Sequence, residues 1–421
     1  MVRDKCNVCG GDHLELVIDL GKHPLADTFL PPAAFEDPET NFPLIVLECS
    51  ACGHAFTKVK IPAEARYMAS DYSYDSSNSA IAEQHFREFA GAIVGTYASI
   101  FPDAKPRRAL DIGSNVGTLL SYFKSDFGID VVGVEPSDNI ANLALQRGIP
   151  TVCALFDDRI ESNEVVSRVK LDVVASTNVM NHIDELASTM ETIRKIGSER
   201  LLFAFEVPYL RDLIEKGAFD TIYHEHVNYF TIRSVSRLLE QSGFSLIHAE
   251  RIEYMGGSLR IYATLKSQSV ECSSDALQLA EAESAYFEDN VWWKSEFQRR
   301  AKATKMALLK FVHSSIGPDD TICCIGAATK GNTLLNYCGL DRDRISVCCD
   351  VSTLKIGKRM PGSQIPIVHD KDLSPGTAYG IVLPWNLSGY LIEKFSGMGM
   401  TLVFPIQGHL VRDGVENEAF N

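Results

Sequence analysis

Four cysteines near the N-terminus constrain the fold of this chain more than any other feature. Cys6 and Cys9 form one Cys-x-x-Cys pair, and Cys49 and Cys52 form a second pair further along. A glycine follows each pair, as in a zinc knuckle, where it turns the chain so that backbone N–H groups point at the thiolate sulfurs. Four thiolates suit a tetrahedral Zn²⁺ with no open position, so we predict a structural zinc site. The alternative is four unrelated cysteines.

The composition limits the kinds of molecule that this protein is expected to bind and the compartment in which it is expected to work. The 421-residue chain has a formal net charge of −15 and no cluster of Lys and Arg, so we expect no nucleic-acid partner. No apolar run is long enough to span a bilayer, and the N-terminus lacks the apolar stretch of a signal peptide. The remaining cysteines lie in apolar stretches, which is typical of a reducing compartment. We therefore expect a cytoplasmic protein without a membrane partner, and the sequence does not define its oligomeric state.

Alternating strand and helix patterns begin at residue 108 and predict a doubly wound, mostly parallel α/β sheet. The run FSLIHAERIEYMGGSLRIYATL predicts two antiparallel strands that close this sheet. Ser79 and Thr231 are the expected N-caps of two helices. Residues 274–316 predict one long helical stretch, and a second, smaller strand–helix pattern follows it. The expected parts are a zinc-binding module (1–68), a sheet domain (69–268), and a linking helix with a C-terminal Rossmann-like domain (269–421).

The segment LDIGSNVGTLL, residues 110–120, is the first candidate site. Gly113 and Gly117 lie between a strand and a helix, where the lack of a side chain lets backbone approach a ligand closely. Their spacing differs from the Gly-x-Gly-x-x-Gly of dinucleotide folds and resembles the first motif of class I S-adenosylmethionine-dependent methyltransferases. Glu135 ends the next strand, where a carboxylate can accept hydrogen bonds from both ribose hydroxyls; the alternative is a plain turn. The expected cofactor-binding residues are Asp111, Gly113, Ser114, Asn115, Gly117, Glu135 and Asn178.

The segment FDTIYHEHVNYF, residues 219–230, concentrates groups that transfer protons. Tyr223, His224, Glu225 and His226 follow a strand and precede a helix, at the sheet end where this architecture binds ligands. Histidine titrates near neutral pH, and a glutamate can orient it or raise its basicity. Strict strand alternation would place His226 opposite Tyr223 and Glu225, so the loop must bend for the three to converge. The alternative is a surface turn with incidental polar residues.

Two further segments follow strands of the expected sheets. In STNVMNHIDE, Asn178 and His182 lie near where a cofactor's methyl group would point, and they would share one face if the segment were helical. The alternative is a turn asparagine and a core histidine. In GAATKGNTLLNYCGL, backbone amides, a helix N-terminus and Lys330 could hold a diphosphate, although the spacing is not that of a P-loop. The alternative there is a solvated turn lysine.

Taken in order, these segments resemble the three-domain sugar C-methyltransferases, which include the 3-C-methyltransferases of deoxysugar pathways. The resemblance covers nearly the whole chain and is most specific in Tyr-His-Glu-His and in Ala-Ala-x-Lys-Gly-Asn. It implies an N-terminal zinc module, a central S-adenosylmethionine domain and a C-terminal Rossmann-like domain, with a nucleotide-linked 4-keto deoxysugar as substrate. Tyr223, Glu225 and His226 would lie around the sugar, with His182 and Asn178 nearby. The implied substrate-binding residues are Tyr74 and Ser76, from the polar loop 70–79, together with His224, Lys330 and Asn332.

The chain departs from the family pattern in two places. Val116 stands where the cofactor turn usually has an acidic residue. The residues after Trp385 and Asn386 read LSGYL, where the family usually has an acidic pair. The first departure bears on the contacts of the cofactor turn, and the second on substrate contacts in the last domain.

The implied chemistry is methylation of a carbon through an enolate. A ketone at C4 acidifies the hydrogen on C3, and the enolate left by its removal attacks the sulfonium methyl group. His226 is the expected base, with Glu225 orienting it or sharing that role. Tyr223 and His182 are expected to hold the enolate oxygen or to return a proton. Three other functions stay open: an O- or N-methyltransferase acting on a sugar or other small metabolite, a nicotinamide-dependent oxidoreductase, and a non-catalytic zinc-ribbon adaptor.

Overall fold

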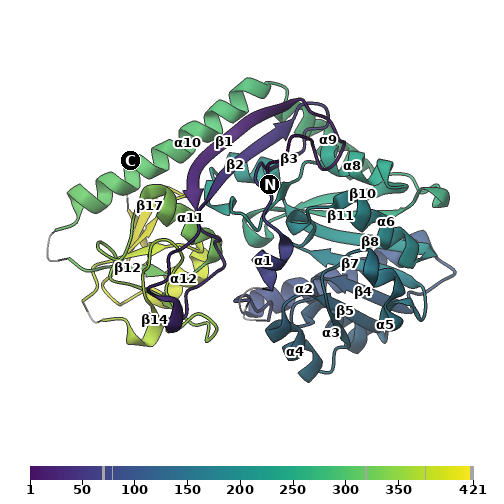
Figure 1. The fold of residues 1–421 in the computed structure, drawn as a ribbon, viewed down its shortest axis with the longest axis horizontal. Helices are drawn as coiled ribbons and strands as arrows, with labels where there is room; N and C mark the ends of the chain where they lie inside the picture. The colour runs from purple at the N-terminus through teal and green to yellow at the C-terminus, as the bar shows by residue number, and fades with distance from the viewer. Residues whose placement is uncertain (69–71, 78, 318–319, 375, 418–421) are drawn as a thin grey trace.

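Three β-sheets organise the chain, as Figure 1 shows. The computed structural model describes residues 1–68, 72–77, 79–317, 320–374 and 376–417. Ser70, Asp71 and Asn78 of the predicted polar loop therefore lie outside the described residues. Within the described residues, no helix combines the length and the apolar character that crossing a bilayer requires.

The N-terminal sheet has the strand order β1-β2-β3-β9 and is antiparallel throughout. Its first three strands are β1 (Leu14–His23), β2 (Phe42–Cys49) and β3 (Ala55–Thr57). The fourth, β9 (Asn228–Tyr229), comes from the middle of the chain and pairs with β3. The sheet that carries the second cysteine pair is therefore completed by the segment that follows the Tyr-His-Glu-His motif. The expected boundaries after residues 68 and 268 remain predictions.

The central sheet confirms the predicted class I methyltransferase fold. Its order is β10-β11-β8-β7-β4-β5-β6, with β8, β7, β4, β5 and β6 parallel and β11 antiparallel between β8 and β10. The predicted antiparallel pair therefore does close the sheet. The strands are β4 (Arg108–Ile112), β5 (Asp130–Glu135), β6 (Thr151–Cys153), β7 (Leu171–Thr177), β8 (Gly197–Pro208), β10 (Phe244–Ile252) and β11 (Ser258–Leu265).

Helices cover both faces of the central sheet, because its inner strands are apolar on both sides. Ala109 of β4 faces a cluster with α2 and α3, whereas its neighbour Leu110 faces a cluster with α6 and α8. The helices are α2 (Ala80–Ile100), α3 (Thr118–Phe127), α4 (Asp138–Gln146), α5 (Glu164–Ser167), α6 (Leu186–Ile196), α7 (Leu210–Glu215) and α8 (Ile232–Gln241). The predicted caps are confirmed: Ser79 Oγ accepts from Ala82 N at 3.1 Å, and Thr231 forms a capping box with Ser234.

The C-terminal sheet has the order β14-β13-β12-β15-β16-β17-β18. The first five strands in this order are parallel, and β17 and β18 add an antiparallel edge. This topology agrees with the predicted Rossmann-like domain. The elements are β12 (Ile322–Ile325), α11 (Thr329–Cys338), β13 (Val347–Asp350), β14 (Ile367–His369), β15 (Tyr379–Val382), α12 (Ser388–Phe395), β16 (Thr401–Phe404), β17 (His409–Arg412) and β18 (Val415–Asn417).

The predicted long helical stretch is two helices, α9 (Ser274–Tyr286) and α10 (Asn290–Lys310). The break comes at Asp289, whose carboxylate caps α10 by accepting from the backbone N–H groups of Val291 and Trp292. Figure 1 shows α10 lying beside β1 and reaching the C-terminal sheet. Trp293 on α10 is fully buried in a cluster that contains both β1 and β12 residues. One apolar core therefore joins the N-terminal and C-terminal parts.

Candidate active site

A cavity of about 1460 Å³ lies where the three parts of the chain meet. Its walls include the residues at the carboxyl ends of β4, β5 and β7 in the central sheet, and of β12 and β13 in the C-terminal sheet. Parallel sheets bind ligands at this end, because the strand-to-helix turns there expose backbone amides and helix N-termini. The N-terminal part contributes α1 (Ala63–Tyr67) and the loop around Asp27.

The cofactor turn is shaped by close packing at Gly113. Its backbone has φ +64°, and a Cβ built there would lie 2.4 Å from Val179 Cγ2. Gly117 does not line the cavity; a Cβ there would lie 2.9 Å from Ile149 Cγ1, so this glycine serves packing at the start of α3. The expectation that Gly117 contacts the cofactor therefore does not agree with its position.

The carboxylates at this end of the sheet are buried but not saturated with hydrogen bonds. Glu135 accepts from the backbone N–H groups of Ser137 at 2.9 Å and of Asn115 at 3.1 Å, which leaves each oxygen a further lone pair. Asp111 Oδ1 and Ser114 Oγ have no partner among the described residues. Burial raises the pKa of Asp111 to about 8, helped by the charge of Glu135. Such unpaired buried atoms fit a polar ligand such as S-adenosylmethionine.

Asn178 and His182 are not related by a helix. Asn178 has φ +55°, and a 3₁₀ turn covers Met180–His182, so the condition for a shared helical face is not met. Both residues nonetheless line the cavity. Asn178 Oδ1 and His182 Nε2 have no partner among the described residues.

The Tyr-His-Glu-His loop bends as the chemistry requires. His226 N donates to Tyr223 O at 3.0 Å, and this turn brings the two side chains together with Tyr223 Oη 2.6 Å from His226 Nε2. His226 Nδ1 lies 2.9 Å from the Thr221 carbonyl. A carbonyl only accepts, so Nδ1 carries the hydrogen and Nε2 accepts from the tyrosine hydroxyl. The partners of the His226 ring are thus Thr221 and Tyr223 rather than Glu225.

Burial shifts the two neighbouring titratable groups in opposite directions. It raises the pKa of Glu225 to about 7 and lowers the pKa of His226 to about 3. Glu225 Oε1 accepts from Asp27 N at 3.0 Å, while Glu225 Oε2 has no partner among the described residues. Both side chains line the cavity.

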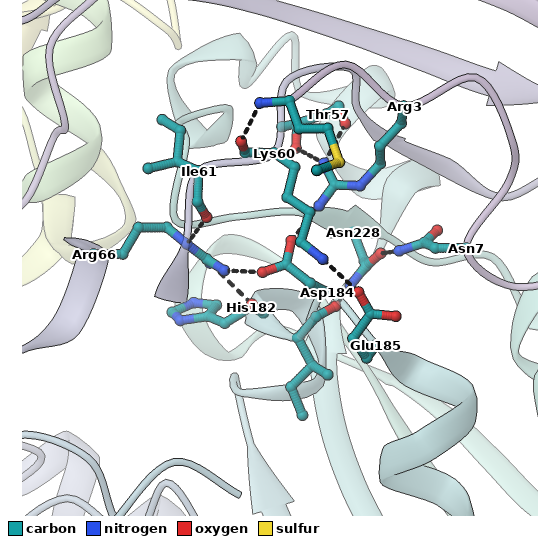
Figure 2. Close-up of polar contacts among 12 residues, drawn as sticks. Arg3, Asn7, Thr57, Lys60, Ile61, Arg66, His182, Asp184, Glu185 and Asn228 are labelled. Atoms are coloured by element: carbon teal, nitrogen blue, oxygen red, sulfur yellow. Dashed lines mark hydrogen bonds and ion pairs between the residues drawn. The ribbon is translucent and has the colours of Figure 1, made fainter. Parts of the chain in front are cut away.

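His182 is held by residues of the N-terminal part, as Figure 2 shows. Its Nδ1 lies 2.9 Å from the hydroxyl of Tyr67, whose ring stacks on the imidazole. Arg66 donates to the His182 carbonyl at 2.9 Å and forms an ion pair with Asp184, which also pairs with Arg3. Burial lowers the pKa of His182 well below its ordinary value. The imidazole is therefore neutral and fixed in orientation.

Two expected substrate-binding residues do not line the cavity. The ring of His224 turns toward β2, where Nε2 lies 3.3 Å from the Pro43 carbonyl and the ring meets Phe42 edge-on. Asn332 is 1% exposed, and its Nδ2 donates to the Ala26 carbonyl at 2.7 Å. Both residues pack the N-terminal part against its neighbours, so the structure does not support a substrate role for either.

The other expected substrate residues do line the cavity: Tyr74, Ser76 and Lys330. Asn115 Nδ2 donates to Tyr74 O at 3.0 Å, and Asn115 Oδ1 accepts from Ser76 N at 2.9 Å, so Asn115 fastens this loop to the cofactor turn. Lys330 Nζ lies 4.1 Å from the centre of the Trp385 ring and donates to Asn386 Oδ1. Burial lowers the pKa of Lys330 to about 8.

The cavity also contains side chains that the sequence analysis does not predict, and four of them are Asp27, Arg66, Tyr67 and Thr329. Three of them belong to the N-terminal part, which was expected only to hold metal. Their one sequence signal is that acidic, basic and aromatic residues stand close to apolar strand residues, which is too common to be decisive.

The four cysteines of the two pairs converge, and their sulfur atoms all lie within 4.8 Å of one another. Cys6 Sγ is 3.6 Å from Cys52 Sγ, and Cys9 Sγ is 3.5 Å from Cys49 Sγ. These separations are too long for disulfides. They are close to the edge of about 3.8 Å that a tetrahedron with Zn–S bonds of about 2.3 Å would have. The donor set therefore fits a structural zinc ion.

Comparison with known proteins gives matches along nearly the whole chain. Residues 6–67 match a zinc binding domain, residues 82–249 a methyltransferase domain, and residues 253–406 the C-terminal domain of C-methyltransferases. C-methyltransferase NovU of Streptomyces niveus is 30% identical over 409 residues, which is 96% of this chain and 95% of NovU.

Solved structures with similarity to the chain include two methyltransferases. The plantazolicin methyltransferase BamL, in complex with a triazolic desmethylPZN analog and SAH, has a TM-score of 0.37 at 14% identity, and the match covers 44% of this chain and 86% of BamL. Magnesium protoporphyrin IX methyltransferase ChlM from Synechocystis PCC 6803, with bound SAM, has a TM-score of 0.33 at 14% identity. The match covers 48% of this chain and 88% of ChlM.

The match to NovU spans both proteins almost from end to end, and the three domain matches follow the order of the three sheets. The cysteine cluster and the cofactor turn lie inside the domains that describe them. The chain therefore belongs to the C-methyltransferase family, as an S-adenosylmethionine-dependent methyltransferase with a structural zinc site.

Proposed function

We propose that the protein methylates C3 of a nucleotide-linked 4-keto deoxysugar through an enolate. One observation carries this proposal: Glu225, the Tyr223–His226 pair and His182 share a cavity with the cofactor turn and with Lys330. Oxygen and nitrogen acceptors already carry a lone pair, whereas a carbon must first lose a proton. A site with several proton-transfer groups beside the methyl donor therefore favours carbon as the acceptor.

The cofactor, when bound, supplies an electrophilic methyl group on a sulfonium centre. Glu135 has free lone pairs for the ribose hydroxyls, and Asp111 and Asn178 each offer an oxygen that has no partner among the described residues. Tyr74 and Ser76 would cover the ligand, because Asn115 holds their loop over the turn.

Glu225 is the side chain best suited to remove the C3 proton. A general base works best when its pKa lies near the working pH, and the pKa of Glu225 is about 7. Its Oε2 also has no partner among the described residues, whereas His226 Nε2 already accepts from Tyr223. His226 instead accepts a hydrogen bond from the Tyr223 hydroxyl and fixes its orientation. The expected assignment of His226 as base thereby becomes the alternative to be tested.

Tyr223 and His182 are suited to the oxygen of the enolate. The single hydroxyl hydrogen of Tyr223 is accepted by His226 and would have to turn to the enolate oxygen, whereas His182 lines the cavity and its Nε2 has no partner among the described residues. Nε2 of His182 carries a hydrogen for the enolate oxygen when Nδ1 accepts the hydrogen bond of the Tyr67 hydroxyl. A donor that is already held at the developing charge, as His182 would be, lowers the barrier because it needs no reorganisation during the reaction.

Lys330 and the N-terminus of α11 are suited to the diphosphate. Lys330 lines the cavity together with Thr329 and Gly326. A helix N-terminus and a lysine both favour a negatively charged group. Asn332 is left out of this set, since it is buried against Ala26.

The direct test incubates the protein with labelled S-adenosylmethionine and nucleotide sugars that carry either a 4-keto or a 4-hydroxy group. We expect label on C3, located by NMR, only with the 4-keto sugars. Label on oxygen or nitrogen, or reaction of the 4-hydroxy sugars, would instead support an O- or N-methyltransferase.

The base is identified by exchange of the C3 hydrogen in heavy water. We expect Glu225→Gln to lose this exchange. His226→Ala should keep most of the exchange while methyl transfer slows, because the tyrosine hydroxyl is no longer directed. The reverse pattern would restore His226 as the base.

A further inference from the structure

Asp27 is an acidic residue of the N-terminal part that touches all three parts of the chain. It lies in the loop between β1 and β2, is 7% exposed and lines the cavity. Its backbone N–H donates to Glu225 Oε1 at 3.0 Å. Its Oδ1 accepts from Ser73 Oγ at 2.8 Å and from Thr329 Oγ1 at 2.6 Å. The carboxylate is therefore held in one orientation by donors from different segments.

The second oxygen of this carboxylate has no partner in the part of the chain that the structure describes. Asp27 Oδ2 is buried and makes no hydrogen bond with any of the residues that the structure describes. Basic side chains that line the cavity have other partners: Arg66 pairs with Asp184, Lys330 donates to Asn386, and Lys355 donates to the Ala327 carbonyl. A buried carboxylate oxygen without a donor is unfavourable, so an oxygen fixed in this state at a cavity wall is suited to a donor on the ligand.

We propose that Asp27 Oδ2 accepts a hydrogen bond from a hydroxyl or amino group on the sugar ring, and that it thereby selects sugars carrying such a group. This inference rests on the proposed function. Because Asp27 N holds Glu225, the selected group lies close to the carbon from which Glu225 removes the proton. A carboxylate can only accept, so a sugar with hydrogen at this position leaves Oδ2 unpaired.

Asp27→Asn tests the inference at a single atom. The amide oxygen can keep the bonds from Ser73 and Thr329, while the amide NH₂ replaces the unpaired oxygen with a donor. The substrates are nucleotide 4-keto sugars with a hydroxyl, an amino group or hydrogen beside the reacting carbon. For sugars with a hydroxyl or amino group, we expect kcat/KM of the variant to fall at least about tenfold. For the sugar with hydrogen, we expect a change below about threefold.

Ser73→Ala is the matched control, since it removes a donor to Oδ1 and leaves Oδ2 unchanged. It should keep the wild-type ratio of kcat/KM between the sugars. Thermal unfolding and calorimetric binding of S-adenosylhomocysteine report whether each variant is folded. If Asp27→Asn does not fold, the inference is tested by the substrate preference of the wild type. We expect its kcat/KM to be at least about tenfold higher for the sugars with a hydroxyl or amino group than for the sugar with hydrogen.

The outcomes separate the two proposals. An equal fall of kcat/KM for all three sugars, or a wild type indifferent to the substituent, would mean that Asp27 is structural, although methylation of C3 would stand. A wild type that methylates none of the 4-keto sugars would overturn the proposed function and this inference with it. The hydroxyl and amino sugars, compared with each other, show which donor Oδ2 prefers.

Discussion

At the scale of single residues, burial decides which groups of this site can exchange protons. Glu225 and His226 are neighbours in the chain, and burial favours the neutral form of both. For the carboxyl this means a pKa near neutrality, and for the imidazole it means a pKa far below it. The first can therefore act as a base at neutral pH, and the second acts on the tyrosine hydroxyl that it already contacts.

The first prediction concerns the pH dependence of activity. Because Glu225 must be deprotonated to act and its pKa is raised to about 7, kcat/KM should be lost as pH falls through about 7 and should level off above it. Glu225→Gln should lower kcat by roughly 10²- to 10⁴-fold and abolish this dependence. Glu283→Gln, which alters a buried glutamate of raised pKa outside the cavity, should leave the midpoint unchanged. A midpoint that persists in Glu225→Gln would assign the titration to another group.

The second prediction concerns the cofactor turn. Gly113→Ala would combine strained φ with a Cβ only 2.4 Å from Val179, so the turn must shift. We expect a loss of about 1–3 kcal/mol of unfolding free energy, and at least about tenfold weaker binding of S-adenosylhomocysteine by calorimetry. Gly128→Ala is the control, because Gly128 has φ +67° but nothing within 4 Å of its Cβ. Gly128→Ala should lower the free energy of unfolding through backbone strain, but it should not weaken the binding of S-adenosylhomocysteine.

At the scale of elements, the two-residue strand β9 links the zinc knuckles to the active site. Asn228 on β9 is fully buried, and its Oδ1 accepts from Asn7 at 2.5 Å and from His54 at 3.1 Å. Its Nδ2 donates to the carbonyls of Met180 at 3.1 Å and Ile183 at 2.7 Å. Figure 2 shows Asn7 and Asn228 beside the segment that carries His182. Asn7 itself stands between the first two cysteines, so a bound metal ion would order one end of this series of contacts.

The third prediction follows from Asn228. Asn228→Ala should lower the free energy of unfolding by about 3 kcal/mol, since it leaves several buried polar groups unpaired.

The same contacts predict an effect of metal removal. Chelation of zinc from the wild type should speed hydrogen exchange at residues 180–183, because Asn7 loses its fixed position. Residues 322–325 of β12, in the C-terminal sheet, serve as the internal reference. Unchanged exchange at 180–183 after metal loss would show that the two sites are independent.

How far the sequence predicts these elements depends on how local the determining contacts are. The caps at Ser79 and Thr231 and the strand-ending Glu135 are decided within a few residues, and each was predictable. The orientation of His224 is decided by β2, far away in the sequence, so adjacency to Glu225 was misleading. Asp27 and the pairing of β9 with β3 depend on contacts between distant segments, for which a single sequence carries no periodic signal.

At the scale of the whole molecule, a buried hydrogen bond joins the C-terminal part to the loop before the Tyr-His-Glu-His motif. Trp385 Nε1 donates to Asp220 Oδ2 at 2.8 Å, and both residues are almost fully buried. The same indole ring lies under Lys330. A movement of the C-terminal sheet would therefore be transmitted to the loop that carries His226.

The fourth prediction tests this hydrogen bond between Trp385 and Asp220. Trp385→Phe keeps an aromatic ring but leaves the Asp220 carboxylate without its donor, so we expect a loss of about 1–3 kcal/mol of unfolding free energy. Lys330 also loses part of the aromatic ring on which its ammonium group packs. KM for the nucleotide sugar should therefore rise several-fold, while S-adenosylhomocysteine binding stays unchanged. Asp220→Asn, which removes the charge and keeps an acceptor for the indole, should be milder. Equal effects of both variants on the two ligands would point to general destabilisation.

The pairing of β9 with β3 also has a consequence for how this protein is made. The knuckles leave the ribosome early and can take up metal, but their sheet lacks its last strand until residues 228–229 emerge. At ordinary rates of translation this interval is on the order of ten seconds. During it, the edge of β3 is unpaired and open to other strands. The nascent chain is therefore most vulnerable to aggregation while the central sheet is still being synthesised.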